Sequence, residues 1–187
     1  LEEELPPGVS LVGGHPIAGT EDSGFESSFP GLFRGARCIL TPGQSSTAAA
    51  GETVRTLWEG VGSQVEIMEG AEHDRTLAVI SHLPHVVAYA LVNTASAYDR
   101  DPPGLLGYVG GGFRDFPRIA ASHPEIGRDI CVDNREEILT AVDRFIEEMT
   151  HLRDLIREKD GAGLEQAFHA ARTVRRSLAA PPEDKAR

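Results

Sequence analysis

The chain has 187 residues, enough for one large or two small domains, and its 40% hydrophobic and 25% charged residues are typical of a globular protein. A formal net charge of −11 argues against a nucleic-acid partner, because such binding requires a basic face. No apolar run approaches the roughly 20 residues of a membrane span, so no membrane contact is expected. Cys38 and Cys131 imply no disulfide framework, and a cytoplasmic location is expected.

The first 70 residues are predicted to form an α/β segment. Three short apolar runs are typical of strands: residues 9–12, 36–40 and 65–68. Before the third run, Ser45, Ser46 or Thr47 is expected to cap a helix. The order strand, helix, strand predicts the last crossover of a parallel sheet.

The chain from residue 71 onward is predicted to be helical. A long helix over residues 72–97 has apolar side chains on most sides, and Pro84 should bend it. Shorter helices are expected at residues 113–122 and 124–131, followed by a long helix that Asn134 caps and a last helix at residues 164–178. Helices that are apolar on more than one side need a partner, so we expect a homodimer through residues 71–180.

His15 is the first candidate functional residue, in the Gly-rich segment Gly13–Gly24. Glycines on both sides let the backbone approach a ligand, and Pro16 fixes the turn after the ring. The pattern predicts a strand end that delivers an imidazole into a cleft, which is what a general base needs. A structural histidine is the alternative that the spacing leaves open.

The second candidate is the segment from Gly110 to Arg118. Three glycines before a helix give a loop whose amides could face an anion. Arg114 and Arg118 are four residues apart, so on one helix they share a face and form a carboxylate receptor, with Asp115 beside them to orient one guanidinium. A solvated, charged helix start is the alternative.

The long helix carries a third polar set, Asp74, Ser81, His82 and His85. His82 and His85 are three residues apart and project to a similar side. Polar contacts within a helix interface would explain them equally well. No further ligand stands at metal-binding spacing, so no metal site is expected.

Together, three segments of the chain resemble the prephenate/arogenate dehydrogenases of tyrosine biosynthesis. They are Gly-Gly-His-Pro-Ile-Ala-Gly-Thr-Glu-Asp-Ser-Gly, Ser-His-Leu-Pro-His and Gly-Gly-Gly-Phe-Arg-Asp-Phe-Pro-Arg-Ile-Ala. The resemblance implies an α+β fragment followed by an all-α part. Residues 1–70 would be the end of a Rossmann-like nucleotide-binding domain, and residues 71–187 a helical dimerisation and substrate-binding domain.

The resemblance also implies NAD(P)-dependent oxidative decarboxylation of a small dicarboxylate, either prephenate to 4-hydroxyphenylpyruvate or arogenate to tyrosine. His15 would take the proton of the 4-hydroxyl group. The family pattern assigns substrate contacts to Arg118, Arg114, His82, His85 and Gly112. It assigns orienting or gating roles to Asp115, Asp74, Glu21 and Ser23, and cofactor contacts to Gly14 and Pro16.

The chain departs from the family pattern in what it lacks. No Gly-x-Gly-x-x-Gly motif follows an opening strand, so the main NAD- or NADP-binding motif is absent and these 187 residues alone are expected to be inactive. Gly127 stands where the family often has tryptophan. Two other functions stay open, a non-catalytic helical dimerisation or regulatory module and a 2-hydroxy-acid-type dehydrogenase with a similar helical tail.

Overall fold

The computed structural model describes residues 5–19, 24–100 and 103–179. The chain divides into two compact units, one up to Ala141 and one from Val142 onward. The first unit holds a three-stranded sheet and the helices that follow it, and the second is helical. The division into family domains near residue 70 stays a prediction.

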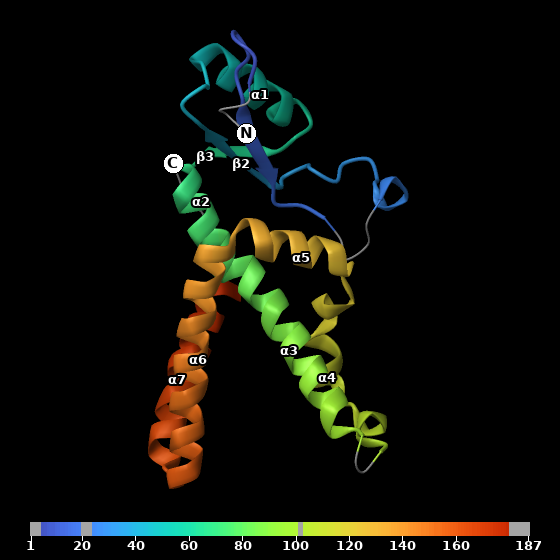
Figure 1. Cartoon of the computed structure of the whole chain (residues 1–187), viewed down its shortest axis with the longest axis vertical. Helices are drawn as coiled ribbons and strands as arrows, with labels where there is room; N and C mark the ends of the chain where they lie inside the picture. The colour runs from blue at the N-terminus through green and yellow to red at the C-terminus, as the bar shows by residue number, and fades with distance from the viewer. Residues whose placement is uncertain (1–4, 20–23, 101–102, 180–187) are drawn as a thin grey trace. The chain divides into compact units, whose positions relative to one another are not determined.

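A three-stranded sheet opens the first unit (Figure 1). Its strands, in sheet order, are β1 (Val12–Pro16), β2 (Arg37–Pro42) and β3 (Gln64–Ile67). β2 and β3 run parallel and are joined by α1 (Ala48–Gly60), which confirms the predicted strand–helix–strand crossover. β1 runs antiparallel to β2, and His15 pairs with Ile39, so the imidazole lies within the strand and not after its end as predicted.

Helix α1 packs on this sheet and fixes its core. The Thr47 hydroxyl accepts a hydrogen bond from the Ala50 N–H at 3.2 Å, so Thr47 is the cap among the three predicted candidates. The Trp58 indole meets the Phe33 ring edge-on at 5.2 Å. Beneath them Cys38 and Leu40 are fully buried, and burial raises the pKa of the Cys38 thiol.

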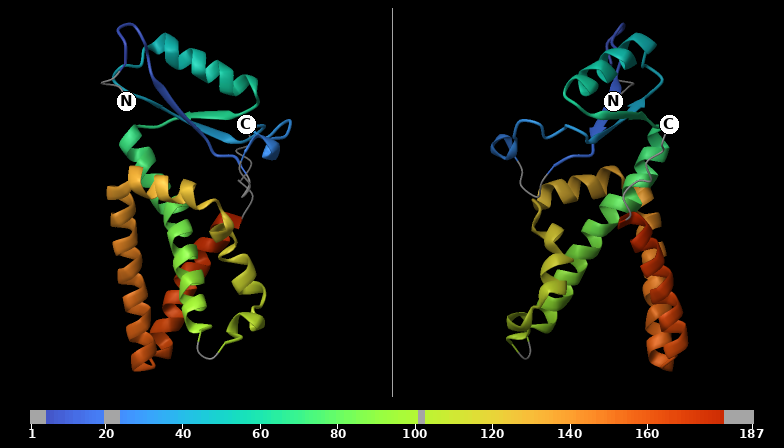
Figure 2. Two further views of the ribbon diagram at one scale, coloured as in Figure 1. Left: turned by 45° about the vertical axis from the view of Figure 1, so that its right-hand side comes forward. Right: turned by 180° about the vertical axis from the view of Figure 1, so that it is seen from behind.

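The long helix predicted over residues 72–97 is one continuous run of three parts (Figure 2). α2 (Gly70–Leu77) passes through the π-helical turn Ala78–His82 into α3 (Leu83–Tyr98). The Leu83 N–H bonds to the Ala78 carbonyl five residues back, directly before Pro84, which has no N–H of its own. The structure thus has a π turn directly before Pro84, and the predicted bend itself stays a prediction.

The run Gly70–Tyr98 is longer and more apolar than the sequence analysis expected of any segment, while the expectation of no membrane contact stays a prediction. With a mean hydropathy of 1.3 over its best window it is long and apolar enough to span a membrane, by length and composition alone. Only 17% of that window is buried within the chain, so most of its apolar surface is left exposed by the chain itself.

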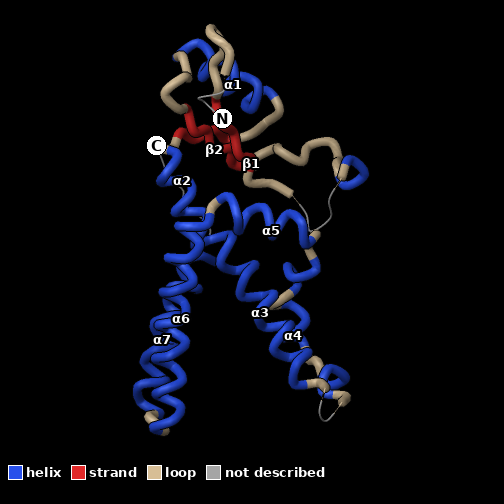
Figure 3. The backbone as a smooth tube through the Cα atoms, viewed as in Figure 1, coloured by secondary structure: helices blue, strands red, loops and turns tan. Residues whose placement is uncertain are grey.

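Helices and the loops between them make up the rest of the described chain, and all described strands precede residue 70 (Figure 3). The α-helices are α4 (Gly111–Asp115), α5 (Pro124–Asp133), α6 (Arg135–Glu158) and α7 (Gly161–Ala179). A short 3₁₀ helix spans Leu105–Tyr108 and another spans Arg118–Ala121. The predicted fold class, an α+β part followed by an all-α part, is confirmed.

The prediction of a single helix over residues 113–122 is wrong. α4 ends at Asp115, and Arg118 begins a separate 3₁₀ helix. Pro117 has no N–H to continue the α-helical ladder from Phe113, and the helix stops there. Arg114 and Arg118 therefore do not share one α-helical face.

We expect Gly14→Ala to destabilise the sheet by about 1–3 kcal/mol. A Cβ at position 14 would lie 3.2 Å from Trp58 Nε1 and 3.3 Å from Leu40 Cδ2, so the α1–sheet contact would have to open. Chemical denaturation measures the change. Gly51→Ala on α1 is the control, because nothing lies within 4 Å of that position and helix propensity predicts a gain of about 0.5–1 kcal/mol. Equal effects of the two variants would contradict the packing argument.

Candidate functional site

A chain of hydrogen bonds links β1 to the start of α2. His15 Nδ1 lies 2.9 Å from His73 Nε2, with the two rings edge-on at a centroid distance of 5.2 Å and an angle of 64°. The second nitrogen of the His73 ring, Nδ1, lies 2.9 Å from Asp74 Oδ1. His73 has only 17% of its side chain exposed, whereas Asp74 has 57%. The structure thus joins two predicted residues, His15 and Asp74, through one that the sequence analysis missed.

We call His15, His73, Asp74 and His82 the histidine cluster. Asn134, at the junction of α5 and α6, bonds to the last two of these residues. Its Nδ2 donates to the Asp74 backbone carbonyl at 2.8 Å and lies 3.3 Å from His82 Nδ1. Because a carbonyl oxygen only accepts, Nδ2 is the donor in both contacts, and a neutral His82 carries its proton on Nε2. The side-chain cap predicted for Asn134 is wrong. Its backbone oxygen accepts the first helical bond, from the Ile138 N–H at 3.1 Å, while its side-chain amide bonds to Asp74 and His82 instead.

His85 is oriented by its own helix. Its Nδ1 lies 2.9 Å from the Ser81 carbonyl oxygen, one turn earlier. That oxygen can only accept, so the proton of a neutral His85 is on Nδ1. The π turn directly before α3 sets the positions of Ser81 and His82, and such turns are frequent at functional sites.

The electrostatic environment keeps two of these imidazoles neutral. The pKa of His15 is lowered, first by burial and then by the neighbouring His73. The pKa of His82 is lowered by burial and by His15, His85 and His73, and the Asp74 carboxylate offsets part of that shift. Near neutral pH His15 is therefore an uncharged imidazole, the form that accepts a proton.

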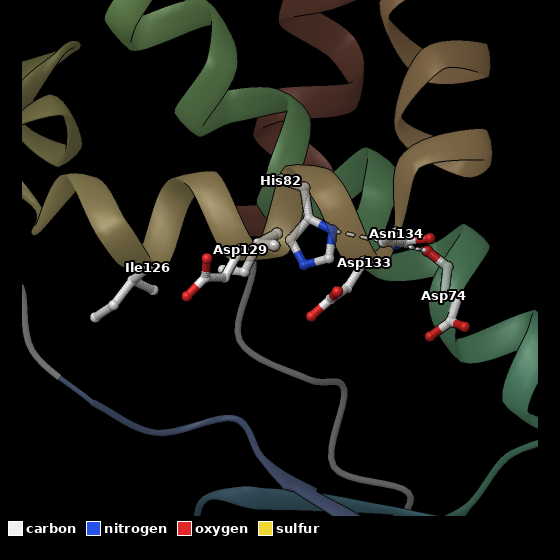
Figure 4. A pocket seen from close by; sticks show the side chains of 7 residues that line it. Asp74, His82, Ile126, Asp129, Asp133 and Asn134 are labelled. Carbon is white, nitrogen blue, oxygen red and sulfur yellow. Dashed lines mark hydrogen bonds between the residues drawn. The ribbon is translucent and has the colours of Figure 1, made fainter. Parts of the chain in front are cut away.

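His82 also lines a pocket of about 440 Å³ in the first unit (Figure 4). The other lining residues are Asp74, Ile126, Asp129, Ile130, Asp133 and Asn134. Figure 4 shows the His82 ring among these carboxylates. Arg128 donates to Asp129 at 2.7 Å, and this hydrogen bond lowers the pKa of Asp129. The pocket thus offers acceptors together with the Nε2–H donor of His82.

The predicted arginine receptor lies on other elements than this histidine cluster. Gly112 is in the first turn of α4, and Arg114 and Asp115 follow it, both exposed. No ion pair joins Arg114 to Asp115 in the part of the chain that the structure describes. Arg118 is exposed at the start of its 3₁₀ helix. The place of the two guanidinium groups beside His15 stays a prediction.

The remaining predicted site residues are near His15 in the sequence. Gly14 lacks a Cβ because Trp58 and Leu40 occupy that space, and Pro16 ends β1 opposite Cys38. Their contact with a cofactor stays a prediction. Glu21 and Ser23 lie outside the described residues. Within residues 5–19, 24–100 and 103–179, no group of three or more His, Cys, Asp or Glu side chains is placed to hold a metal ion.

Gly127, which stands where the family often has tryptophan, lies beside the aromatic ring of Tyr89. A Cβ at this position would lie 3.4 Å from Tyr89 Cε2. The Tyr89 hydroxyl donates to the Ser122 carbonyl at 3.3 Å, which holds the ring over α5.

Two family models match the chain over nearly its whole length. One describes the nucleotide-binding domain of prephenate dehydrogenase and matches residues 1–67. The other describes the dimerization domain of prephenate dehydrogenase and matches residues 69–170. The chain belongs to the prephenate dehydrogenase family.

Relatives with known names agree with this membership. The chain is 36% identical to the cyclohexadienyl dehydrogenase of Zymomonas mobilis over 179 residues, which are 95% of this chain and 61% of that protein. It is 37% identical to the prephenate dehydrogenase of Bacillus subtilis over 177 residues, 95% of this chain and 48% of that protein. The chain thus spans about half to three fifths of these relatives.

Solved structures of the family share the fold. The prephenate dehydrogenase of Aquifex aeolicus in complex with hydroxyphenyl propionate and NAD⁺ superposes with a TM-score of 0.84 at 41% identity, over 89% of this chain and 58% of that chain. The arogenate dehydrogenase of Synechocystis superposes with a TM-score of 0.78 at 27% identity, over 90% of this chain and 62% of that chain.

We expect His15 and His82 to titrate below the ordinary histidine pKa of about 6.5. The folded chain then binds fewer protons than the unfolded chain, so their contribution to stability is complete above pH about 6.5 and is lost as the pH falls through the lowered folded pKa values. NMR titration of the imidazole protons measures the midpoints. Midpoints of His15 and His82 at or above the ordinary value of about 6.5 would contradict the burial argument.

Proposed function

We propose that the complete protein carrying these residues oxidatively decarboxylates prephenate or arogenate with NAD⁺ or NADP⁺, and that His15 is its general base. The observation that carries this proposal is the neutral imidazole of His15, bonded through Nδ1 to His73 and with a pKa below the ordinary value. Family membership and the names of the relatives support the reaction class.

His15 would act on the 4-hydroxyl group of the substrate ring. Its Nε2 makes no hydrogen bond within the described part of the chain, and a lone pair there accepts the hydroxyl proton. As the proton leaves the oxygen and a hydride leaves C4, a carbonyl forms at C4. The ring carboxylate then departs as CO₂, and the electron pair of the broken bond passes through the ring to the C4 oxygen, which gives an aromatic phenol. Aromatisation supplies much of the driving force, so the chain mainly has to hold the substrate and remove one proton.

A nicotinamide cofactor, when bound, supplies the hydride acceptor for C4. The match of residues 1–67 to a nucleotide-binding family model supports this assignment. The sequence contains no Gly-x-Gly-x-x-Gly motif, which is the main dinucleotide-binding motif. We propose that these 187 residues alone do not catalyse the reaction.

Arg118 and Arg114 are proposed to bind the substrate carboxylates, since two guanidinium groups match a dicarboxylate in charge and geometry. His82 and His85 are proposed to line the same site. The keto group of prephenate and the amino group of arogenate distinguish the two substrates, and kinetics of the complete protein with both substrates and both cofactors would identify the pair it uses.

In the complete protein, His15→Asn is expected to lower kcat about 10²–10⁴-fold, because the amide cannot accept the hydroxyl proton. Steady-state assays with prephenate and with arogenate measure the loss. His151→Asn is the matched control, because His151 is exposed on α6 and belongs to neither candidate cluster. A His15→Asn enzyme as fast as the control would remove His15 from the mechanism.

We also propose a homodimer through residues 71–180, supported by the dimerization-domain model that matches residues 69–170. The second unit exposes a series of large apolar side chains: Ile146, Met149, Ile156, Phe168, Val174 and Leu178. Exposed apolar surface of this extent marks an interaction site.

Sedimentation equilibrium at micromolar concentration is expected to give twice the 20.1 kDa chain mass. Phe168→Glu places a charge on the apolar series and should shift the chain toward the monomer, whereas Gln166→Glu adds the same charge on the same helix and should not. A wild-type chain that sediments as a monomer would rule out this interface.

A further inference from the structure

The ring of His73 makes two hydrogen bonds that constrain each other. Its Nδ1 faces Asp74 Oδ1 and its Nε2 faces His15 Nδ1, both at 2.9 Å. A carboxylate only accepts, so the proton of a neutral His73 must be on Nδ1. Its Nε2 then carries a lone pair, and that lone pair requires a donor from His15.

The donor can only be the Nδ1–H of His15. A neutral imidazole has one N–H, so when Nδ1 holds the proton, Nε2 is unprotonated. The two bonds to His73 therefore determine the tautomer of His15, although Asp74 never touches that ring. The resulting form has its basic lone pair on the nitrogen that has no partner within the described chain.

We infer that His73 is a positioning residue, which together with Asp74 holds His15 in the Nδ1–H tautomer and so keeps Nε2 available as the proton acceptor. This inference rests on the proposed role of His15 as the base. The arrangement works like other relays in which a carboxylate orients a catalytic imidazole, here with a second imidazole between the two.

The surroundings of His73 are built to keep this geometry. Only 17% of its side chain is exposed, and Asn134 ties the Asp74 backbone to the α5–α6 junction at 2.8 Å. The same Asn134 nitrogen faces His82 Nδ1, so His82 does not compete as an acceptor for the His15 proton. β1 and α2 thus meet at the His73 ring, and the α5–α6 junction holds the Asp74 backbone next to it.

A protonated His73 would reverse the relay. Its Nε2–H would then donate to His15 Nδ1, and His15 would carry its own proton on Nε2, where it blocks the base. The groups around the pair are Asp74 on α2, His82 on the π turn, His85 at the start of α3 and the neutral Asn134. The test of the tautomer therefore belongs at pH about 8, above the ordinary histidine pKa of about 6.5.

The direct test is a long-range ¹H–¹⁵N NMR spectrum of the 187-residue chain with ¹⁵N-labelled histidine, at pH about 8. We expect both His15 and His73 to carry their protons on Nδ1. His73→Leu should release His15 from this tautomer. His73→Gln should keep it, because the amide oxygen can accept from His15 while the amide nitrogen donates to Asp74.

Two outcomes would overturn the inference. One is a wild-type His15 protonated on Nε2, and the other is an unchanged Nδ1–H signal in His73→Leu. If His73→Leu does not fold, Asp74→Asn serves instead, since an amide can donate to His73 Nδ1 as well as accept from it, so that His73 no longer has to hold its proton on Nδ1. We then expect the Nε2–H form of His15 to appear beside the Nδ1–H form, and an Asp74→Asn chain with His15 wholly in the Nδ1–H form would count against the inference in the same way.

Kinetics of the complete protein give the second readout. His73→Leu is expected to lower kcat by about 10²-fold with little change in KM, because His73 touches the base and not the substrate, and His73→Gln should restore most of the rate. A higher KM with an unchanged kcat, or equal kcat values for His73→Leu and His73→Gln, would contradict the positioning role. Failure of the proposed function has a different signature, since His15→Asn would then leave kcat unchanged whatever the NMR tautomer is.

Discussion

The hydrogen bond between His15 and His73 is the contact on which the candidate site depends. It joins a strand to a helix that begins 54 residues further along the chain, and each partner is held by its own local structure. On the strand side, β1 pairs antiparallel with β2, and Gly14 lets Trp58 of α1 approach the strand closely. On the helix side, Asp74 holds the other nitrogen of the His73 ring. A shift of one residue in β1 would turn the imidazole to the opposite face of the sheet and break the chain of bonds.

The second half of the cluster depends on an irregular helix. Pro84 cannot donate to the helical ladder, and the backbone responds with a π turn that ends at His82. Asn134 then bonds both to the Asp74 carbonyl on α2 and to His82 at the end of this turn, so the α5–α6 junction connects α2 to the end of the π turn. His15 and His82 thereby present opposite hydrogen-bonding characters, one an acceptor and the other a donor, although both are neutral imidazoles.

The sequence predicted what local rules decide. The β2–α1–β3 crossover and a cap among Ser45, Ser46 and Thr47 follow from apolar periodicity and capping chemistry. The missing N–H of Pro84 marked the place of the π turn, although the prediction there was a bend. It could not predict what depends on distant partners. The antiparallel direction of β1 is decided by pairing with β2, and the role of His73 by a residue 58 positions away. The end of the helix before Pro117 follows from the missing proline N–H and could have been predicted. The prediction instead relied on the four-residue spacing of Arg114 and Arg118, which is typical of one helix face.

The charges around the cluster limit how an anionic substrate could bind. The pocket beside His82 has three carboxylates, of which Asp74 is bonded to His73 and Asp129 to Arg128, while Asp133 has no ion pair in the described chain. With a net charge of −11, the chain offers no general positive field to attract a dicarboxylate. Binding of such a substrate therefore requires local guanidinium groups, and the histidines contribute by staying uncharged. A neutral imidazole brings no charge of its own to the substrate hydroxyl group. The neutral His15 also keeps a lone pair that can accept the hydroxyl proton.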